Sequence, residues 1–294
     1  MKLLDWLAPG VGRLSAYARR ELKLPSPSLA EAAKASCSLR ISVVVPSFNQ
    51  AKFIEQTLDS LLAEGFPHLE VVVVDGASTD ATADVLRAFG PRLSSWVSEP
   101  DNGQADAINK GFRRSTGEIM AWLNSDDMIV PGTLHRVARF FAENPDVDVV
   151  YGDRILVDEE GRDIGRWVLP GHSGSLLKWV DFVPQETLYW RRRAWQAIGG
   201  AVDERLRFAV DWDILLRFSK AGLKFAHIPE FLGIFRIHAT QKTSSVIATT
   251  GREEMTALRR RELGFAPSRS LIILRALPYL LRSRWREIRH GTGN

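Results

Sequence analysis

Residues Ile119 to Met128 read IMAWLNSDDM, an apolar run that ends in two adjacent carboxylates. The apolar part predicts a buried strand, which places the two acids at its C-terminal edge. Ligands bind at that edge in open α/β sheets. Neighbouring carboxylates repel each other, and a hard divalent cation that bridges to substrate phosphates would offset this cost. The alternative is a polar turn after a core strand, and the rest of the chain has to decide.

The chain has 294 residues, of which 45% are hydrophobic and 25% charged, as in an ordinary globular protein. Its single cysteine, Cys37, excludes an intrachain disulfide and favours a reducing compartment. We see no secretory signal at the start and no transmembrane stretch of about 18 apolar residues. We therefore expect a cytoplasmic protein. The net charge of +4 has no nucleic-acid recognition motif beside it, so we expect no nucleic-acid partner.

Strands and helices alternate along the first part of the chain. β-branched, apolar runs predict strands at 41–46, 69–75, 95–98 and 119–123, with amphipathic helices between them. Such alternation indicates an α/β protein with a parallel sheet covered on both faces. Further along we predict a helix from Pro131, a strand at 147–153, a hairpin at 154–168, a helix that opens at Asp211, and strands at 224–228 and 231–236.

Three segments carry a resemblance. They read ISVVVPSFNQAKFIEQTLDSLLAEGFPHLEVVVVDGASTDAT from Ile41, EPDNGQADAINKGFRRSTGEIMAWLNSDD from Glu99, and VDWDILLRF from Val210. In this order they resemble the family 2 glycosyltransferases, over residues 41 to about 240. The resemblance implies the GT-A fold, a Rossmann-like, mostly parallel sheet flanked by helices in a single catalytic domain. It also implies an inverting enzyme with a nucleotide-sugar donor and a divalent metal, Mn²⁺ or Mg²⁺.

The resemblance also divides the chain. The GT-A domain would span 41–245, with a nucleotide-binding half at 41–130 and an acceptor half at 131–245. Residues 1–40 would form a basic amphipathic extension and linker, and residues 246–294 a basic helical extension with Pro278 interrupting a long helix. Each extension could bind an anionic membrane surface, mediate a homodimer or pack on the catalytic domain.

The donor site is predicted by matching residues to the family pattern. Pro46, Ser47 and Asn49 map to the nucleoside loop. Asp75 maps to the acid that holds the base or ribose, although an aspartate there could also cap the next helix. Gln104 and Asn109 map to the loop and helix that cover the nucleotide, although Asn109 could simply be solvated.

The acidic pair of the opening stretch falls in the family's DXD segment, which here reads Asn124-Ser125-Asp126-Asp127. Asn124 replaces the first acid, so it can hydrogen-bond a ribose hydroxyl or a metal-bound water but adds no charge. With Ser125 we assign it to the nucleotide. Asp126 is the expected main metal ligand and Asp127 a second ligand or support. His238, in a late Arg-x-His segment, is a further expected metal ligand and is otherwise structural.

Asp211 matches the family's catalytic base, which would take the proton of the attacking acceptor hydroxyl. The alternative is that Asp211 caps its helix, and we expect Asp213 to point elsewhere as the cap. Gln185 and Glu186 map to the acceptor side. Three tryptophans are either a sugar platform or core, namely Trp190, Trp195 and Trp212.

These matches predict transfer of a sugar to a saccharide or lipid-linked saccharide acceptor, in cell-surface polysaccharide or glycolipid synthesis. Asn124 leaves open a different class, a catalytically inactive nucleotide-sugar-binding partner subunit. A nucleotidyltransferase is less consistent with the sequence, because no Gly-rich phosphate loop with Arg and Lys follows the first strand. The sugar, nucleotide, acceptor and linkage are not specified.

Overall fold

The computed structural model describes residues 18–24, 38–239, 241 and 247–289. Within the predicted N-terminal extension and linker at 1–40, residues 1–17 and 25–37 lie outside the described residues. The strands are β1 (Ile41–Ser47), β2 (Leu69–Asp75), β3 (Ser95–Ser98), β4 (Ile119–Trp122), β5 (Met128–Ile129), β6 (Val149–Val157), β7 (Asp163–Trp167), β8 (Tyr189–Arg191) and β9 (Phe225–Arg236). The α-helices are α3 (Ile54–Leu62), α4 (Thr82–Phe89), α5 (Gln104–Arg114), α6 (Thr133–Glu143), α7 (Gly174–Leu177), α8 (Arg192–Ala197), α9 (Val210–Lys220), α11 (Arg252–Leu263) and α12 (Arg269–Arg289). Shorter helical turns are η1 (Gly90–Arg92), η2 (Gln185–Thr187) and η3 (Ile247–Gly251).

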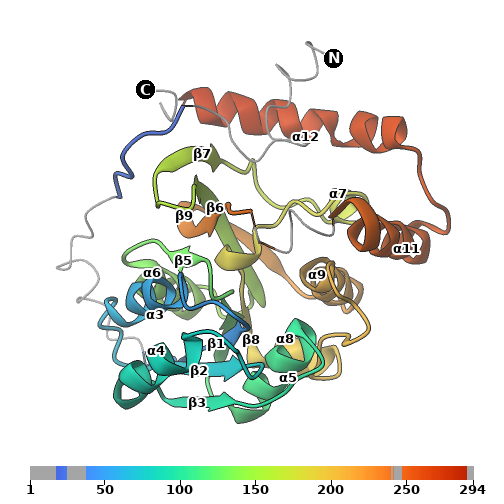
Figure 1. Ribbon diagram of the computed structural model, residues 1–294. Helices are drawn as coiled ribbons and strands as arrows, with labels where there is room; N and C mark the ends of the chain where they lie inside the picture. The colour runs from blue at the N-terminus through green and yellow to red at the C-terminus, as the bar shows by residue number, and fades with distance from the viewer. Residues whose placement is uncertain (1–17, 25–37, 240, 242–246, 290–294) are drawn as a thin grey trace.

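In the described part of the chain these strands form one nine-stranded sheet in the order β3-β2-β1-β4-β8-β6-β9-β5, with β7 paired to β6. β1 runs parallel to β2 and β4, and β2 runs parallel to β3. Ser47 pairs with Asp75, and Val44 pairs with Trp122. The C-terminal ends of these strands therefore meet at one edge, which confirms the predicted α/β class and places the loop after β4 beside the loop after β1 (Figure 1).

The second half of the sheet is mixed. β8 is antiparallel to β4 and β6, whereas β9 is parallel to β6 and antiparallel to β5. β9 is one long strand where the sequence predicted two, because register shifts in β6 around Asp153 absorb the irregularity. β5 and β8 were not predicted, since two or three residues are too few to show a period.

Two apolar layers cover the sheet, because successive strand residues face opposite sides. Val43, Val45 and Ala121 pack with helices α3, α4 and α6. Val44 and Trp122 pack with helices α5, α8 and α9 on the other side (Figure 1). Trp190, Trp195 and Trp212 belong to this second layer and are 0, 5 and 0% exposed, so these three tryptophans are core.

The C-terminal helices pack on the domain. Leu258 of α11 and Ala276 of α12 belong to the second apolar layer. On α12 the Tyr279 hydroxyl donates to the carbonyl of Gly171 at 3.0 Å, and the Ser283 hydroxyl to that of Val168 at 2.6 Å. Pro278 lies inside α12, which continues through it, contrary to the interruption that the sequence suggested (Figure 1).

Candidate active site

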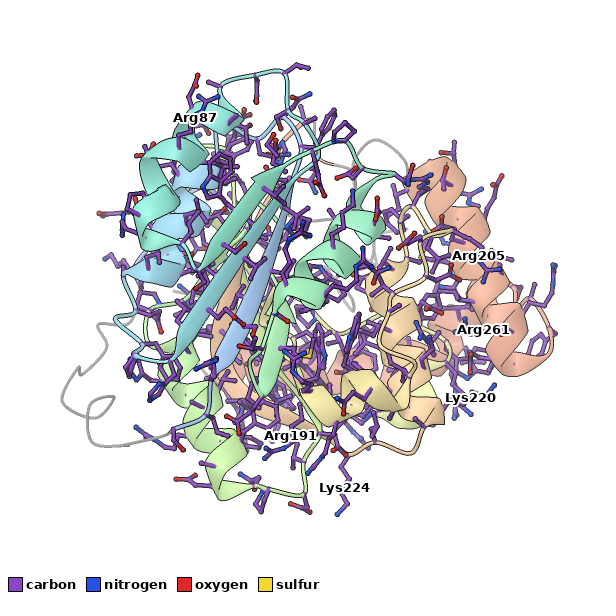
Figure 2. The ribbon with its side chains drawn as sticks, turned by 90° about the horizontal axis from the view of Figure 1, so that it is seen from below. Arg87, Arg191, Arg205, Lys220, Lys224 and Arg261 are labelled. Atoms are coloured by element: carbon purple, nitrogen blue, oxygen red, sulfur yellow. The ribbon has the colours of Figure 1, made fainter. Side chains whose placement is uncertain are left out.

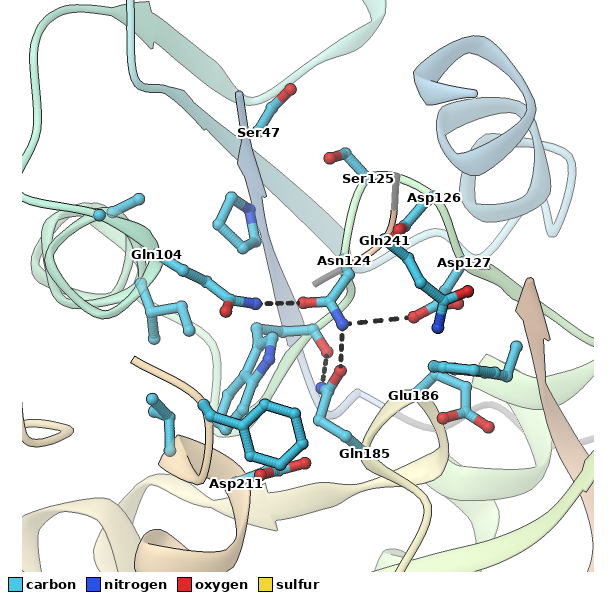
Figure 3. Close-up of a pocket in the computed structure, with 18 of the residues that line it drawn as sticks. Ser47, Gln104, Asn124, Ser125, Asp126, Asp127, Gln185, Glu186, Asp211 and Gln241 are labelled. Atoms are coloured by element: carbon cyan, nitrogen blue, oxygen red, sulfur yellow. Dashed lines mark hydrogen bonds between the residues drawn. The ribbon is translucent and has the colours of Figure 1, made fainter. Parts of the chain in front are cut away.

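A cavity of about 1000 Å³ opens at the C-terminal edge of β1, β2 and β4. Its wall includes residues from the β1 loop, from α5, from the loop after β4, from the segment before β8 and from the start of α9 (Figure 3). Eight predicted site residues line it: Pro46, Ser47, Gln104, Asn124, Ser125, Asp126, Asp127 and Asp211. The structure therefore brings together predicted site residues as far apart in the sequence as Pro46 and Asp211, a separation of 165 residues.

Asn124 links the two sides of the cavity. Its Oδ1 accepts a hydrogen bond from Gln104 Nε2 at 2.7 Å, and its Nδ2 donates to Gln185 Oε1 at 3.1 Å and to Asp127 Oδ2 at 3.3 Å (Figure 3). A carboxylate in this place has no N–H to donate and would face the Asp127 carboxyl. The amide at position 124 therefore fits the hydrogen bonds of this site better than an acid would.

Asp126 and His238 meet as predicted. His238 Nε2 lies 2.9 Å from Asp126 Oδ2, and the imidazole packs 4.6 Å from the Phe53 ring. No group of three or more His, Cys, Asp or Glu side chains in the described residues is arranged to hold a metal ion. Two protein ligands nevertheless suit a Mg²⁺-like ion, because such ions take their remaining ligands from water and substrate phosphates.

Asp127 is buried behind Asp126. Its Oδ1 accepts from the backbone N–H of Arg236 at 3.1 Å. Burial, followed by the nearby charges of Asp126 and Glu186, raises the pKa of Asp127 well above its usual range. This concentration of carboxyl groups is an environment that a divalent cation would stabilise. The pair of Asp126 and His238, with Asp127 behind it, therefore fits the metal that the fold family implies.

The Arg236 side chain fixes the loop that carries these acids. Its Nε donates to the carbonyl of Asp126 at 3.1 Å, and its Nη2 donates to Gln56 Oε1 at 2.6 Å. The guanidinium also lies over the Phe53 ring, 5.0 Å from its centre. Arg236 therefore ties the end of β9 to the loop after β4 and to the start of α3.

Among the predicted nucleoside contacts, Ser47 faces the cavity and its buried hydroxyl has no hydrogen-bond partner in the described residues. Asn49 lies outside the cavity lining and accepts from the backbone N–H of Thr79 at 2.8 Å. Asp75 is fully buried, and its carboxylate accepts from the backbone N–H of Ser78 at 3.0 Å and from the Ser98 hydroxyl at 2.6 Å. Asn49 and Asp75 thus hold the loops after β1 and β2 beside this end of the cavity.

Asn109 does not reach the cavity. Its Nδ2 donates to the carbonyl of Val202 at 3.1 Å and to Glu204 Oε1 at 2.7 Å, and its Oδ1 accepts from the Val202 backbone N–H at 2.9 Å. These bonds use the whole amide to anchor the segment before α9. We therefore leave Asn109 out of the nucleotide site.

Asp211 lies in the first turn of α9 and lines the cavity, across from Asp126 (Figure 3). The turn has no side-chain cap of its own. Instead Glu254 of α11 accepts from the backbone N–H groups of Arg207, Phe208 and Ala209 at 2.7, 2.9 and 2.9 Å. A carboxylate from a distant helix therefore holds the backbone that leads into α9. Asp211 is not the N-cap residue, which is Ala209, but its Oδ1 accepts from the backbone N–H of Trp212 at 2.9 Å.

Asp213 is not a cap either. It is buried and forms ion pairs with Arg261 of α11 at 2.5 Å and with Arg217 at 3.6 Å. Figure 2 shows Arg261 at the outer edge of the molecule. Asp213 thus gives α11 a second contact with α9, and the segment predicted as a separate extension helps to hold the helix of Asp211.

The sequence alone does not identify Arg154 and Asp181, which both line the cavity. Arg154 donates to Glu186 Oε1 through its Nε at 2.7 Å and forms a second bond to Oε2, in the space between the Trp167 and Phe235 rings. Asp181 lies on the cavity wall in a stretch where Trp179, Val180, Phe182 and Val183 are apolar. The sequence does contain a signal for Asp181, because a single acid within an apolar run indicates a buried carboxyl.

The comparison with family models decides the class. A model described as glycosyl transferase family 2 matches residues 42–213. The chain belongs to this family. It is a glycosyltransferase, and the matched region contains every predicted site residue except His238.

Two relatives of this chain are also named as glycosyltransferases. A PGL/p-HBAD biosynthesis glycosyltransferase of Mycobacterium bovis (strain BCG / Pasteur 1173P2) is 32% identical over 194 residues, covering 64% of this chain and 73% of the relative. An uncharacterized glycosyltransferase of Nostoc sp. is 27% identical over 232 residues, covering 74% of this chain and 70% of the relative.

Two solved structures share the fold. TarS 1-349 of S. aureus in complex with UDP-GlcNAc aligns with a TM-score of 0.63 and 21% identity, over 85% of this chain and 75% of that chain. The mannosyltransferase PcManGT of Pyrobaculum calidifontis in complex with GDP-Man and Mn²⁺ aligns with a TM-score of 0.58 and 19% identity, over 90% of this chain and 81% of that chain. At these identities the likeness establishes the GT-A fold.

Proposed function

We propose that this family 2 glycosyltransferase moves a sugar from a nucleotide-diphosphate sugar to an acceptor hydroxyl by a single displacement with inversion. The observation that carries the proposal is the single cavity that joins Asp126 and His238 on one side to Asp211 on the other. The Ser47 hydroxyl, which lacks a partner in the described residues, supplies a donor and acceptor for the nucleoside.

Asp211 takes the proton of the acceptor hydroxyl as its oxygen bonds to the anomeric carbon, and the bond from that carbon to the diphosphate breaks. The nucleoside diphosphate leaves with the bonding electrons. Asp126 and His238 would hold Mn²⁺ or Mg²⁺, with Asp127 as support or a further ligand. Such an ion, when bound, neutralises the departing diphosphate. The mannosyltransferase solved with GDP-Man and Mn²⁺ supports this assignment by fold.

The test separates binding from chemistry. We expect UDP or GDP to bind more tightly with Mn²⁺ than without it in calorimetric titrations, and Asp126→Asn to remove most of that gain. Asp211→Asn should lower transfer by a factor of about 10² to 10⁴ while nucleotide binding persists, because only the base is lost. Asp84→Asn, on the exposed face of α4, is the matched control. Transfer that survives Asp211→Asn unchanged would exclude Asp211 as the base.

Asn124 keeps a second function open, that of an inactive nucleotide-sugar-binding partner subunit. Its hydrogen bonds organise the cavity, which favours an active enzyme. Nucleotide binding without turnover on any acceptor would support the inactive subunit instead.

We further propose that the acceptor is a saccharide or lipid-linked saccharide of cell-surface polysaccharide or glycolipid synthesis, and that α12 lies on the cytoplasmic membrane face. The mycobacterial relatives are named for PGL/p-HBAD biosynthesis, which supports a glycolipid. None of the helices in the described part of the chain has the length and apolar character needed to cross a bilayer.

The membrane proposal rests on the outer face of α12. Five exposed apolar side chains follow one another at spacings of three, seven, four and three residues, and so share a face: Leu271, Leu274, Leu281, Trp285 and Ile288. Arg275, Arg282 and Arg289 lie beside them along the helix. Such a face suits an anionic bilayer. Co-sedimentation with phosphatidylglycerol vesicles should be lost in Trp285→Ser, whereas dimerisation without vesicle binding would identify α12 as a homodimer contact.

A further inference from the structure

The carboxyl group of Asp181 is not used by the proposed reaction. Asp181 lies between α7 and η2 and lines the cavity together with Phe182 and Val183. Its Oδ1 is buried and has no hydrogen-bond partner within the described residues. The backbone N–H of Val183 bonds the carboxyl. A buried carboxyl oxygen without a partner is costly unless a ligand supplies the partner.

The neighbouring cations do not supply that partner. The guanidinium of Arg154 is bound to both carboxylate oxygens of Glu186. The Nε of Arg259 donates to the carbonyl of Trp179 at 2.9 Å. Both arginines act on Asp181 only through their charge, which is weaker than the opposing effects of burial and of Asp211. A hydrogen-bonded ion pair with either arginine therefore does not explain the position of Asp181 on the cavity wall.

Burial changes the hydrogen-bonding capacity of Asp181. Burial, followed by the charge of Asp211, raises the pKa of Asp181 well above its usual range. A neutral carboxyl has one O–H to donate and a carbonyl oxygen to accept. In its neutral form Asp181 can therefore exchange hydrogen bonds with an alcohol, next to the alcohol that Asp211 deprotonates in the proposed reaction.

We propose that Asp181 binds a second hydroxyl of the acceptor, adjacent to the hydroxyl that Asp211 deprotonates. The acceptor is then a sugar residue or polyol with neighbouring hydroxyls, and not a molecule with one isolated hydroxyl. The apolar side chains of Phe182, Phe208 and Met255 line the same cavity and suit the C–H faces of a sugar ring. This inference rests on the proposed function and specifies its acceptor.

The test uses hydroxyl discrimination. p-Nitrophenyl glycosides in the gluco, galacto and manno series, each with its monodeoxy analogues, serve as acceptors for the full chain with UDP- and GDP-sugars. We expect the wild-type protein to prefer one parent glycoside over the analogue lacking the neighbouring hydroxyl by about tenfold or more in kcat/KM, since a site that hydrogen-bonds a hydroxyl rejects its deoxy form. Asp181→Leu should reduce that ratio to about one, mainly through KM, whereas Asp181→Asn, which keeps a donor and an acceptor, should retain most of it.

Calorimetric titration of the variants with UDP and Mn²⁺ shows whether the donor site is intact, and Asp84→Leu is the matched surface control. A hydroxyl preference that persists in Asp181→Leu would overturn the inference, as would a wild-type enzyme that transfers without preferring any parent glycoside. Failure of the wild-type protein to bind any nucleotide would overturn the proposed function itself, and this inference with it.

Discussion

Replacing Glu254 tests whether α11 positions the base. In Glu254→Ala, three backbone N–H groups before Asp211 lose their charged acceptor. The N–H of Arg207 is exposed and water can replace the bond, whereas those of Phe208 and Ala209 are partly buried. Each partly buried N–H group that loses its charged acceptor costs about 1 kcal/mol. We expect a loss of about 2 kcal/mol in unfolding free energy.

The assays are thermal unfolding and sugar transfer. For a chain of this size about 2 kcal/mol corresponds to a fall in Tm of about 4 to 8 °C. Because the first turn of α9 carries Asp211, we also expect kcat to fall about tenfold while the Kd for UDP with Mn²⁺ is unchanged. Glu254→Gln retains one oxygen acceptor and should show about half the loss of stability.

Glu253→Ala is the matched control, because Glu253 is the exposed neighbour on the same turn. If Glu254→Ala unfolds at the temperature of Glu253→Ala and keeps the wild-type kcat, Glu254 does not position Asp211. A drop in stability with unchanged kcat would limit Glu254 to a structural role.

Two further predictions concern residues in the predicted acceptor half, 131–245. Burial, followed by the charge of His227, lowers the pKa of His172 from 6.5 to about 4. Between these pH values the unfolded chain binds a proton that the folded chain does not, so the free energy of unfolding should rise as pH rises from 4 to 7. The urea midpoint of His172→Phe should rise less over this range than that of the wild-type protein. An equal rise in both proteins would contradict this. Arg154→Met leaves the buried Glu186 charge without its partner and should cost about 3 to 5 kcal/mol in urea unfolding, whereas the double variant Arg154→Met with Glu186→Leu should recover much of the loss. Equal instability of the single and double variants would show that packing, and not charge, dominates at this pair.

The sequence predicts the strands of residues 41–130 better than the contacts of residues 131–245. β1, β2 and β4 are apolar runs bounded by turn residues, so the hydrophobic pattern finds them and places Ser47, Asp75 and the Asp126 loop at one edge. Family matching added Asp211 and the meeting of Asp126 with His238. The roles of Glu254 and Asp181 could not be found in this way, because they depend on contacts between segments that approach only in the folded chain. A pair of acids at the start of α11 is indistinguishable, in sequence, from ordinary charges at a helix N-terminus.

The bonds of Arg236 have a consequence for how the chain can be divided. They join β9 to the Asp126 carbonyl and to Gln56, across sequence separations of 110 and 180 residues. A fragment that ends before β9 would carry the acidic pair and the parallel strands β1 to β4, yet it would lack both His238 and the arginine that shapes the loop. In a chain synthesised from its N-terminus, the loops after β1 and β2 can therefore form before the contact between Asp126 and His238 does. In the proposed mechanism the metal site is then completed only when residue 238 has joined the fold.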